Sequence, residues 1–177
     1  MKAGTQTIDM SGAEGNLTYT LEAATTILTG SAGNDTVTLS SNGLDALDNI
    51  DLGAGTDSVS VPAVTTLGTT TRVAAETLTL TFGANTTADT SDFLSSTITT
   101  LAIDGAATSM STDLTLNNLG VTNVRITDFA DTASQDTLTL NYQSGTTSAV
   151  IEIDEYGAAA GSGDDENLTI TGTTGAL

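Results

Sequence analysis

The stretch Gly30-Ser31-Ala32-Gly33-Asn34-Asp35-Thr36-Val37 decides the fold, and Leu52-Gly53-Ala54-Gly55-Thr56-Asp57-Ser58-Val59 repeats its pattern. In both stretches a glycine stands two residues before an aspartate, and an apolar residue stands two residues after it. Glycine lets the backbone turn tightly because no side chain is in the way. The pattern therefore predicts a turn that leads into a β-strand and gathers a carboxylate and backbone carbonyl oxygens around one small, hard cation such as calcium.

The two turns lie 22 residues apart, which is a plausible length for one coil of a solenoid. Stacking of successive coils would place one cation between Asp35 and Asp57. The repeat is not strict beyond these turns, so we expect an all-β, irregular parallel β-solenoid similar to a β-helix or β-roll. A β-sandwich with Greek-key connections is the alternative, because many short strands separated by turns fit that fold equally well.

Short runs with a period of two predict the strands, with Leu, Ile or Val facing a core and Thr, Ser or Asp facing solvent. Helical periodicity is almost absent, and the best candidate for a helical turn is 44–48. The predicted strands are 16–21, 36–39, 57–61, 76–81, 97–99, 101–103, 113–116, 124–126, 136–140, 150–153 and 167–171.

The length of 177 residues suits one domain, so we expect a single β-solenoid domain over 1–177 or a segment of a longer repetitive protein. No apolar stretch follows Met1-Lys2, and nothing approaches the length of a transmembrane helix. Export would then use an uncleaved C-terminal signal, unless the chain is part of a longer one. We expect no insertion into a membrane.

The charge excludes several classes of partner. There are 22 acidic residues against three basic ones, for a formal net charge of −19. Nucleic acids and anionic membrane surfaces need a basic protein surface and are poor partners. Divalent cations are the natural counter-charge.

Neither cysteine nor histidine occurs, which excludes disulfides, thiol nucleophiles, imidazole bases and metal sites built on these residues. Two carboxylates suffice for glycoside hydrolysis, but aromatic residues for sugar subsites and basic residues for an acidic sugar are scarce. We identify no catalytic constellation and predict that the chain is not an enzyme. A calcium-dependent lyase or hydrolase on a β-helix is the least favoured alternative.

Further acids offer weaker candidates for cation ligands. Asp48 and Asp51 precede the second turn, where they either add ligands or are solvated turn residues. Other acidic turns are expected to be solvated loops, with Asp164 and Asp165 the first to reconsider. These are Asp89, Asp92, Asp128, Asp131, Asp136 and the run 163–166.

Pairs of the form Thr-x-Thr recur along the chain, and a regular ladder of such pairs can bind ice. The intervals between the pairs are uneven, which predicts ordinary outward-facing strand positions and not a flat, evenly spaced array. The pairs are Thr18/Thr20, Thr36/Thr38, Thr77/Thr79, Thr137/Thr139 and Thr169/Thr171.

Three segments, 28–37, 50–57 and 76–81, resemble parts of bacterial RTX-type surface proteins, such as calcium-dependent S-layer proteins and β-solenoid adhesins. Ile126-Thr127-Asp128-Phe129 is similar to an element that often follows RTX repeats. The resemblance covers about a third of the chain. Two positions depart from the family pattern, since Ser31 and Leu52 stand where glycines are usual.

The resemblance implies a set of calcium ligands. Asp35 and Asp57 would bind Ca²⁺ through their side chains, and Gly30, Ala32 and Ala54 through their carbonyl oxygens. It also implies type I secretion and folding on contact with external calcium.

We therefore expect a non-enzymatic extracellular protein of the bacterial cell surface, a calcium-stabilised building block of an S-layer or surface filament. Its partners would be further copies of itself, or related surface proteins, in a polymer or lattice. The alternative is a calcium-dependent adhesin module that binds a glycan or a surface.

Overall fold

A computed structural model of the chain describes most of its strands and the turns between them. The residues that the structure describes are 5–21, 26–39, 44, 48–64, 72–82, 86–92, 97–104, 113–127, 137–146, 148–153 and 167–172.

The described residues form three parallel sheets. The long sheet has seven strands in the order β14-β12-β10-β8-β6-β4-β2, the N-terminal sheet has the order β1-β3-β5-β7, and the C-terminal sheet has the order β15-β13-β11-β9. The strands are β1 (Gln6–Asp9), β2 (Thr18–Leu21), β3 (Thr26–Thr29), β4 (Thr36–Leu39), β5 (Asn49–Asp51), β6 (Ser58–Val64), β7 (Arg72–Ala74), β8 (Thr77–Phe82), β9 (Thr86–Asp89), β10 (Thr100–Asp104), β11 (Leu114–Leu119), β12 (Asn123–Thr127), β13 (Thr137–Tyr142), β14 (Val150–Ile153) and β15 (Asn167–Thr171).

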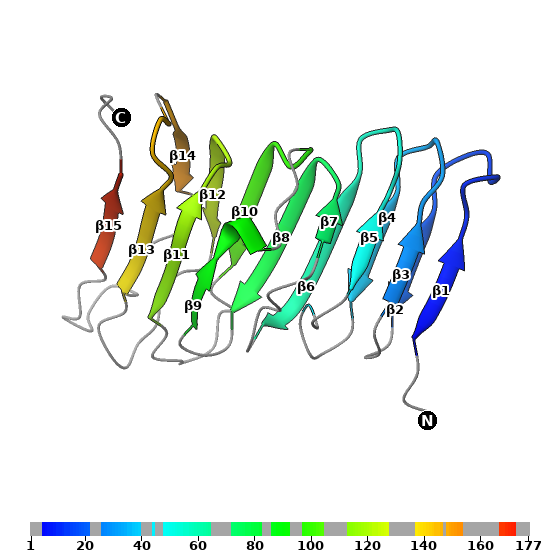
Figure 1. Ribbon diagram of the computed structural model, residues 1–177, viewed down its shortest axis with the longest axis horizontal. Helices are drawn as coiled ribbons and strands as arrows, with labels where there is room; N and C mark the ends of the chain where they lie inside the picture. The colour runs from blue at the N-terminus through cyan, green and yellow to red at the C-terminus, as the bar shows by residue number, and fades with distance from the viewer. Residues whose placement is uncertain are drawn as a thin grey trace.

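The sheets form the two faces of a β-solenoid, with the long sheet on one face and the two short sheets end to end on the other (Figure 1). Each coil rises through an odd-numbered strand, turns at the upper edge of Figure 1 and descends through the next even-numbered strand. Every strand pair in the described residues is parallel, whereas a Greek-key sandwich needs antiparallel strands. The solenoid prediction is confirmed and the sandwich alternative is wrong.

The core lies between the two faces because apolar and polar residues alternate along each strand. In β8, Leu78, Leu80 and Phe82 are fully buried, while the threonines between them are partly exposed. Buried aliphatic side chains continue this core from Leu21 to Leu140. Full burial of one such apolar side chain contributes about 1.5–3 kcal/mol, and this stabilises the stacked coils.

Coil length varies along the solenoid, as expected for an irregular one. Equivalent positions in successive coils from Leu17 onward are separated by 18, 22, 19 and 23 residues. The step from Asp35 to Asp57 accounts for the 22 residues that the sequence predicts for one coil. The variation lies outside the paired strands, since Thr36, Ser58 and Thr77 are direct partners in the long sheet.

Two smaller predictions need correction or completion. The run 97–99 is not a strand, because β10 begins at Thr100 and Thr99 already donates its backbone N–H to the Glu76 carbonyl oxygen. The helical turn predicted at 44–48 falls largely outside the described residues, and Leu44 forms an isolated bridge there. The part of the chain that the structure describes contains no helix long and apolar enough to cross a bilayer.

Candidate functional site

The two glycine-rich turns lie directly above one another at the edge of the solenoid. The first joins β3 to β4 and the second joins β5 to β6, which are neighbouring coils. The backbone N–H of Asp35 donates a hydrogen bond to Oδ1 of Asp57 at 2.8 Å. The fold thus brings together the two aspartates that the sequence predicts as side-chain ligands.

The turns stack too closely for side chains at their glycines. A Cβ atom on Gly30 would clash with the carbonyl oxygen of Leu52 in the next turn, and one on Gly33 would lie 2.6 Å from the carbonyl carbon of Gly15 in the preceding coil. Gly53 and Gly55 have positive φ angles of 90° and 144°, which disfavour residues with a Cβ. Close packing of one turn on the next therefore explains the glycines without reference to a cation.

Asp35 is buried and accepts several hydrogen bonds. Its Oδ1 accepts from the Leu17 backbone N–H at 2.9 Å and the Ser31 hydroxyl at 2.8 Å, and its Oδ2 accepts from the Ser31 backbone N–H at 2.7 Å. Burial alone would raise the pKa of the Asp35 carboxyl, but these hydrogen bonds together hold it below its ordinary value. The stable form of Asp35 is an ionised acceptor of N–H and O–H groups.

The same arrangement repeats from coil to coil, and sequence reasoning missed it. Each acid that directly precedes a strand of the long sheet accepts the backbone N–H of the equivalent residue one coil earlier. Leu17 donates to Asp35, Asp35 donates to Asp57, and Asp57 donates to Oε2 of Glu76 at 2.7 Å. We call Asp35, Asp57 and Glu76 the acid ladder. The sequence signal that could have revealed the acid ladder is an acid immediately before a strand in three successive coils.

Asp57 differs from Asp35 because half of its carboxylate lacks a partner. Its side chain is 1% exposed, and Oδ2 has no hydrogen-bond partner among the described residues. Burial raises the pKa of the Asp57 carboxyl, against the lowering effect of the hydrogen bond from Asp35. The negative charges of Glu76, Asp35 and Asp51 raise the pKa further. A buried carboxylate oxygen without a donor is costly, and a cation would satisfy it.

The other predicted ligands surround the turns less closely. Gly30 is buried and donates its N–H to the Asp51 carbonyl oxygen at 2.7 Å, while Ala32 and Ala54 are exposed. The Asp51 side chain is also exposed, and its Oδ1 accepts the Gly53 N–H at 3.1 Å within its own turn. Across the described ranges, no three acidic side chains already converge as a metal-binding group.

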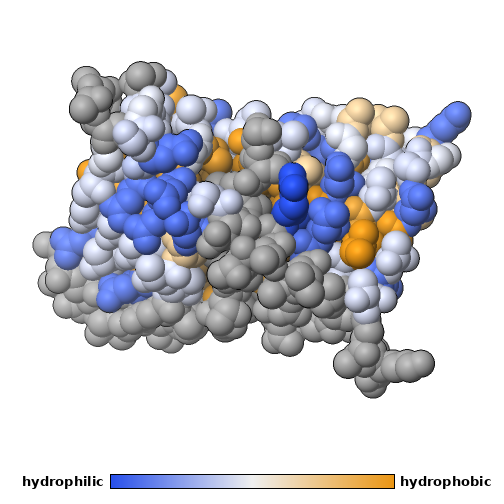
Figure 2. Space-filling model, in the orientation of Figure 1, coloured by the Kyte–Doolittle hydropathy of each residue, from blue (hydrophilic) through white to orange (hydrophobic). Residues whose placement is uncertain are grey.

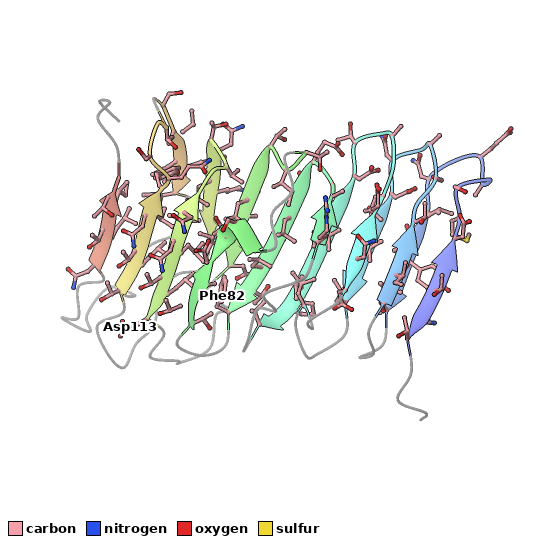
Figure 3. All side chains as sticks on the ribbon, viewed as in Figure 1. Phe82 and Asp113 are labelled. Carbon is pink, nitrogen blue, oxygen red and sulfur yellow. The ribbon has the colours of Figure 1, made fainter. Side chains whose placement is uncertain are left out.

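Two further aspartates bridge coils at the opposite edge of the solenoid. Asp48 is buried and accepts the Thr26 N–H on its side chain at 2.7 Å. Asp113, which Figure 3 labels at the lower edge, accepts the Thr137 N–H on its side chain at 3.0 Å and the Thr86 N–H on its carbonyl oxygen at 2.9 Å. These acids therefore hold coils together and are not only solvated turn residues.

Of the remaining acids that the sequence offers as weaker cation ligands, the structure describes the side chain of Asp89. Asp89 bonds the backbone N–H and hydroxyl of Ser91 through Oδ1, and the side-chain amide of Asn118 through Oδ2. The side chain of Asp92 and the residues Asp128, Asp131, Asp136 and 163–166 lie outside the described residues.

Comparison with protein-family models, with curated proteins and with solved structures returns no match for this chain.

Proposed function

We propose that this chain is a non-enzymatic structural protein of the bacterial cell surface, a calcium-stabilised building block of an S-layer or surface filament. The observation that carries the proposal is the buried Oδ2 of Asp57, which has no hydrogen-bond partner in the part of the chain that the structure describes and lies beside the negative charges of Glu76, Asp35 and Asp51. A hard divalent cation prefers carboxylate and carbonyl oxygens, and both occur in the stacked turns.

Calcium would act by linkage between binding and folding. Without the cation, the charges around Asp57 repel one another and its unpartnered oxygen opposes the folded state. A ligand that binds only the folded chain at 100 times its dissociation constant adds about 2.7 kcal/mol of stability. That is a large share of the usual stability of a domain. Low calcium inside the cell would keep the chain loose for type I secretion, and external calcium would fold it.

Assembly would use the outermost strands of the sheets. Strands β2 and β14 are the outer strands of the long sheet, and β1 and β15 are outer strands of the short sheets. Val150 and Ile153 on β14 are 64% and 46% exposed. An outer strand with exposed apolar side chains is a template for pairing with another chain. The partners we propose are further copies of this chain or related surface proteins.

The experiment is a calcium titration with reversal by EGTA, read by circular dichroism and by negative-stain electron microscopy. We expect β-structure and ordered sheets or fibres with calcium, and the loss of both with EGTA. Magnesium at the same concentration is the control for ionic screening. A fold that is indifferent to EGTA contradicts the calcium mechanism, and a calcium-dependent fold that stays monomeric favours an adhesin module instead.

A further inference from the structure

The outward face of the long sheet carries two columns of hydroxyl side chains over its first four coils. The Thr-x-Thr pairs of this face are unevenly spaced in the sequence, and that spacing predicts that they do not form a regular array. The pairs do occupy outward-facing strand positions, as predicted, but those on β2, β4 and β8 also lie in register, because the variable lengths fall between the strands. The first column is Thr18, Thr36, Ser58 and Thr77, and the second is Thr20, Thr38, Ser60 and Thr79. We call these eight residues the hydroxyl face.

The spacing of the hydroxyl face follows from strand geometry. Parallel strands lie about 4.7–4.9 Å apart, and residues two apart on one strand are separated by about 6.6 Å. The strands of the long sheet are direct partners at these positions, so each column continues from one coil to the next. Within the first column, the Ser58 hydroxyl lies 3.3 Å from Oγ1 of Thr36. Threonine is stiff at χ1, so its hydroxyl and methyl groups hold their positions at little entropic cost.

The hydroxyl face carries no charge, although the chain has a net charge of −19. In the turns next to these columns, Asp35 and Asp57 are buried and Glu76 is half-buried. Farther along the long sheet the second column continues through Ala102, Arg125 and Glu152, so the uncharged hydroxyl array is confined to one half of the sheet. The presence of hydroxyl side chains at all eight of these positions, over four coils, needs an explanation.

The opposite face of the solenoid is different. Exposed charges interrupt its N-terminal sheet at Asp9, Asp51 and Arg72. Figure 2 shows hydrophilic residues gathered over β9, β11 and β13 of its C-terminal sheet. Asp89 and Asn117 are direct partners there. One column of this sheet, Thr87, Thr115, Thr139 and Thr169, is also uncharged and in register, but the column beside it begins at the charged Asp89. Among the described residues, two adjacent columns of hydroxyl side chains lie in register on the hydroxyl face.

We propose that the hydroxyl face binds ice. Both of its repeats are close to distances between oxygen atoms on the surface of an ice crystal, and a rigid, neutral array can hold water molecules in such a lattice. A crystal surface binds through many weak, regularly spaced contacts, which matches eight equivalent side chains better than it matches a single small ligand. The outward positions of β2, β4, β6 and β8 include no aromatic side chain, since the exposed Tyr19 is aligned with the inward Val37, and this argues against a glycan. The proposal is independent of the calcium site.

The test measures partitioning into slowly growing ice, together with thermal hysteresis, in calcium-containing buffer. The variant Thr38→Tyr places a bulky ring in the middle of the array, on strand β4. Its matched control is Thr29→Tyr, on the preceding strand β3 and the other face of the same coil. Tyrosine is well tolerated on strands, and circular dichroism checks that both variants fold.

We expect the wild-type protein and Thr29→Tyr to enter the ice, and Thr38→Tyr to lose most of this affinity. The serines of β6 lack the methyl groups of the other coils, so the double variant Ser58→Thr and Ser60→Thr should increase thermal hysteresis. Exclusion of the folded wild-type protein from ice would overturn the proposal. So would unchanged ice affinity in folded Thr38→Tyr, or adsorption to crystalline cellulose without any affinity for ice.

Discussion

At the scale of single residues, the acid ladder joins three coils through each of its members. Asp57 accepts the Asp35 N–H on its side chain, and its carbonyl oxygen accepts the Thr77 N–H at 3.0 Å. Asp35 likewise accepts from Leu17 on its side chain and from Ser58 on its carbonyl oxygen. The acids before β4, β6 and β8 therefore satisfy turn N–H donors that would otherwise lack a partner.

The turn glycines give a first prediction. Replacing Gly55 with alanine should destabilise the protein by more than about 1 kcal/mol, because φ is 144° and the added Cβ would meet the Gly33 carbonyl group. Urea denaturation measures the loss. The control is Gly12→Ala, where nothing lies within 4 Å of the new Cβ and stability should stay the same or rise slightly. Equal effects of the two substitutions would refute close turn stacking.

Asp35 gives a prediction about pH. Its pKa in the folded chain lies below the ordinary value of 3.8, so its ionisation stabilises the fold above that pH and this contribution is lost as pH falls through the folded pKa. The difference in unfolding free energy between the wild type and Asp35→Asn should therefore be largest above about pH 4 and shrink in acid. Urea denaturation at several pH values measures it, and a difference that does not vary with pH would contradict the assignment.

The ionisation of Asp57 has the opposite effect on stability. Its raised pKa means that its contribution to stability is present below the unfolded value of 3.8 and is lost as pH rises through the folded pKa. At neutral pH its charge therefore opposes folding in the absence of a cation.

At the scale of elements, the strands of the long sheet were predictable and those of the N-terminal sheet were not. Strands β4 and β8 alternate apolar and polar residues clearly, and the run from 76 to 81 predicted β8 almost to the residue. Strands β5 and β7 have three residues each, Asn49–Asp51 and Arg72–Ala74, which is too short to show a period of two. Their pairing with neighbouring coils, and not their own sequence, defines them.

The candidate site was predictable only in part. The repeated turn pattern correctly placed Asp35 and Asp57 in neighbouring coils. It did not show that the Leu17 N–H of the preceding coil already donates to Asp35, since that bond depends on how the coils stack. For the same reason, uneven spacing in the sequence concealed the register of the hydroxyl face.

Strand β8 gives a third prediction. Phe82, labelled in Figure 3, is fully buried at the end of β8 and lies opposite Val64 of β6. The chain moves from the N-terminal to the C-terminal sheet next to this strand. Phe82→Ala should cost about 3–5 kcal/mol of unfolding free energy because of lost burial and a cavity.

Chemical denaturation measures this cost. Phe82→Leu, which keeps an apolar side chain, should recover part of the loss. A cost for Phe82→Ala below about 1 kcal/mol would mean that the core at this junction is not packed as described.

At the scale of the whole molecule, the solenoid puts separate properties on separate surfaces. The turns along one edge contain the acid ladder, one face of the long sheet contains the hydroxyl face, and the outer strands are open to pairing in the described structure. Because each coil contacts mainly its neighbours, stability is close to a sum of local terms. The cation that we propose at one step of the ladder would therefore stabilise the adjoining coils directly.

The most direct test of the cation account compares unfolding of the wild type and Asp57→Asn in calcium and in EGTA. Asparagine keeps an acceptor for the Asp35 N–H and removes the buried charge. Asp9→Asn is the control, because Asp9 is exposed and bonds only within its own turn, to Ser11.

We predict that calcium stabilises the wild type and Asp9→Asn by about 2–3 kcal/mol when it is present at 100 times its dissociation constant. It should stabilise Asp57→Asn far less, and in EGTA this variant should be at least as stable as the wild type. Equal stabilisation of all three proteins by calcium, or none in the wild type, would contradict a cation at Asp57.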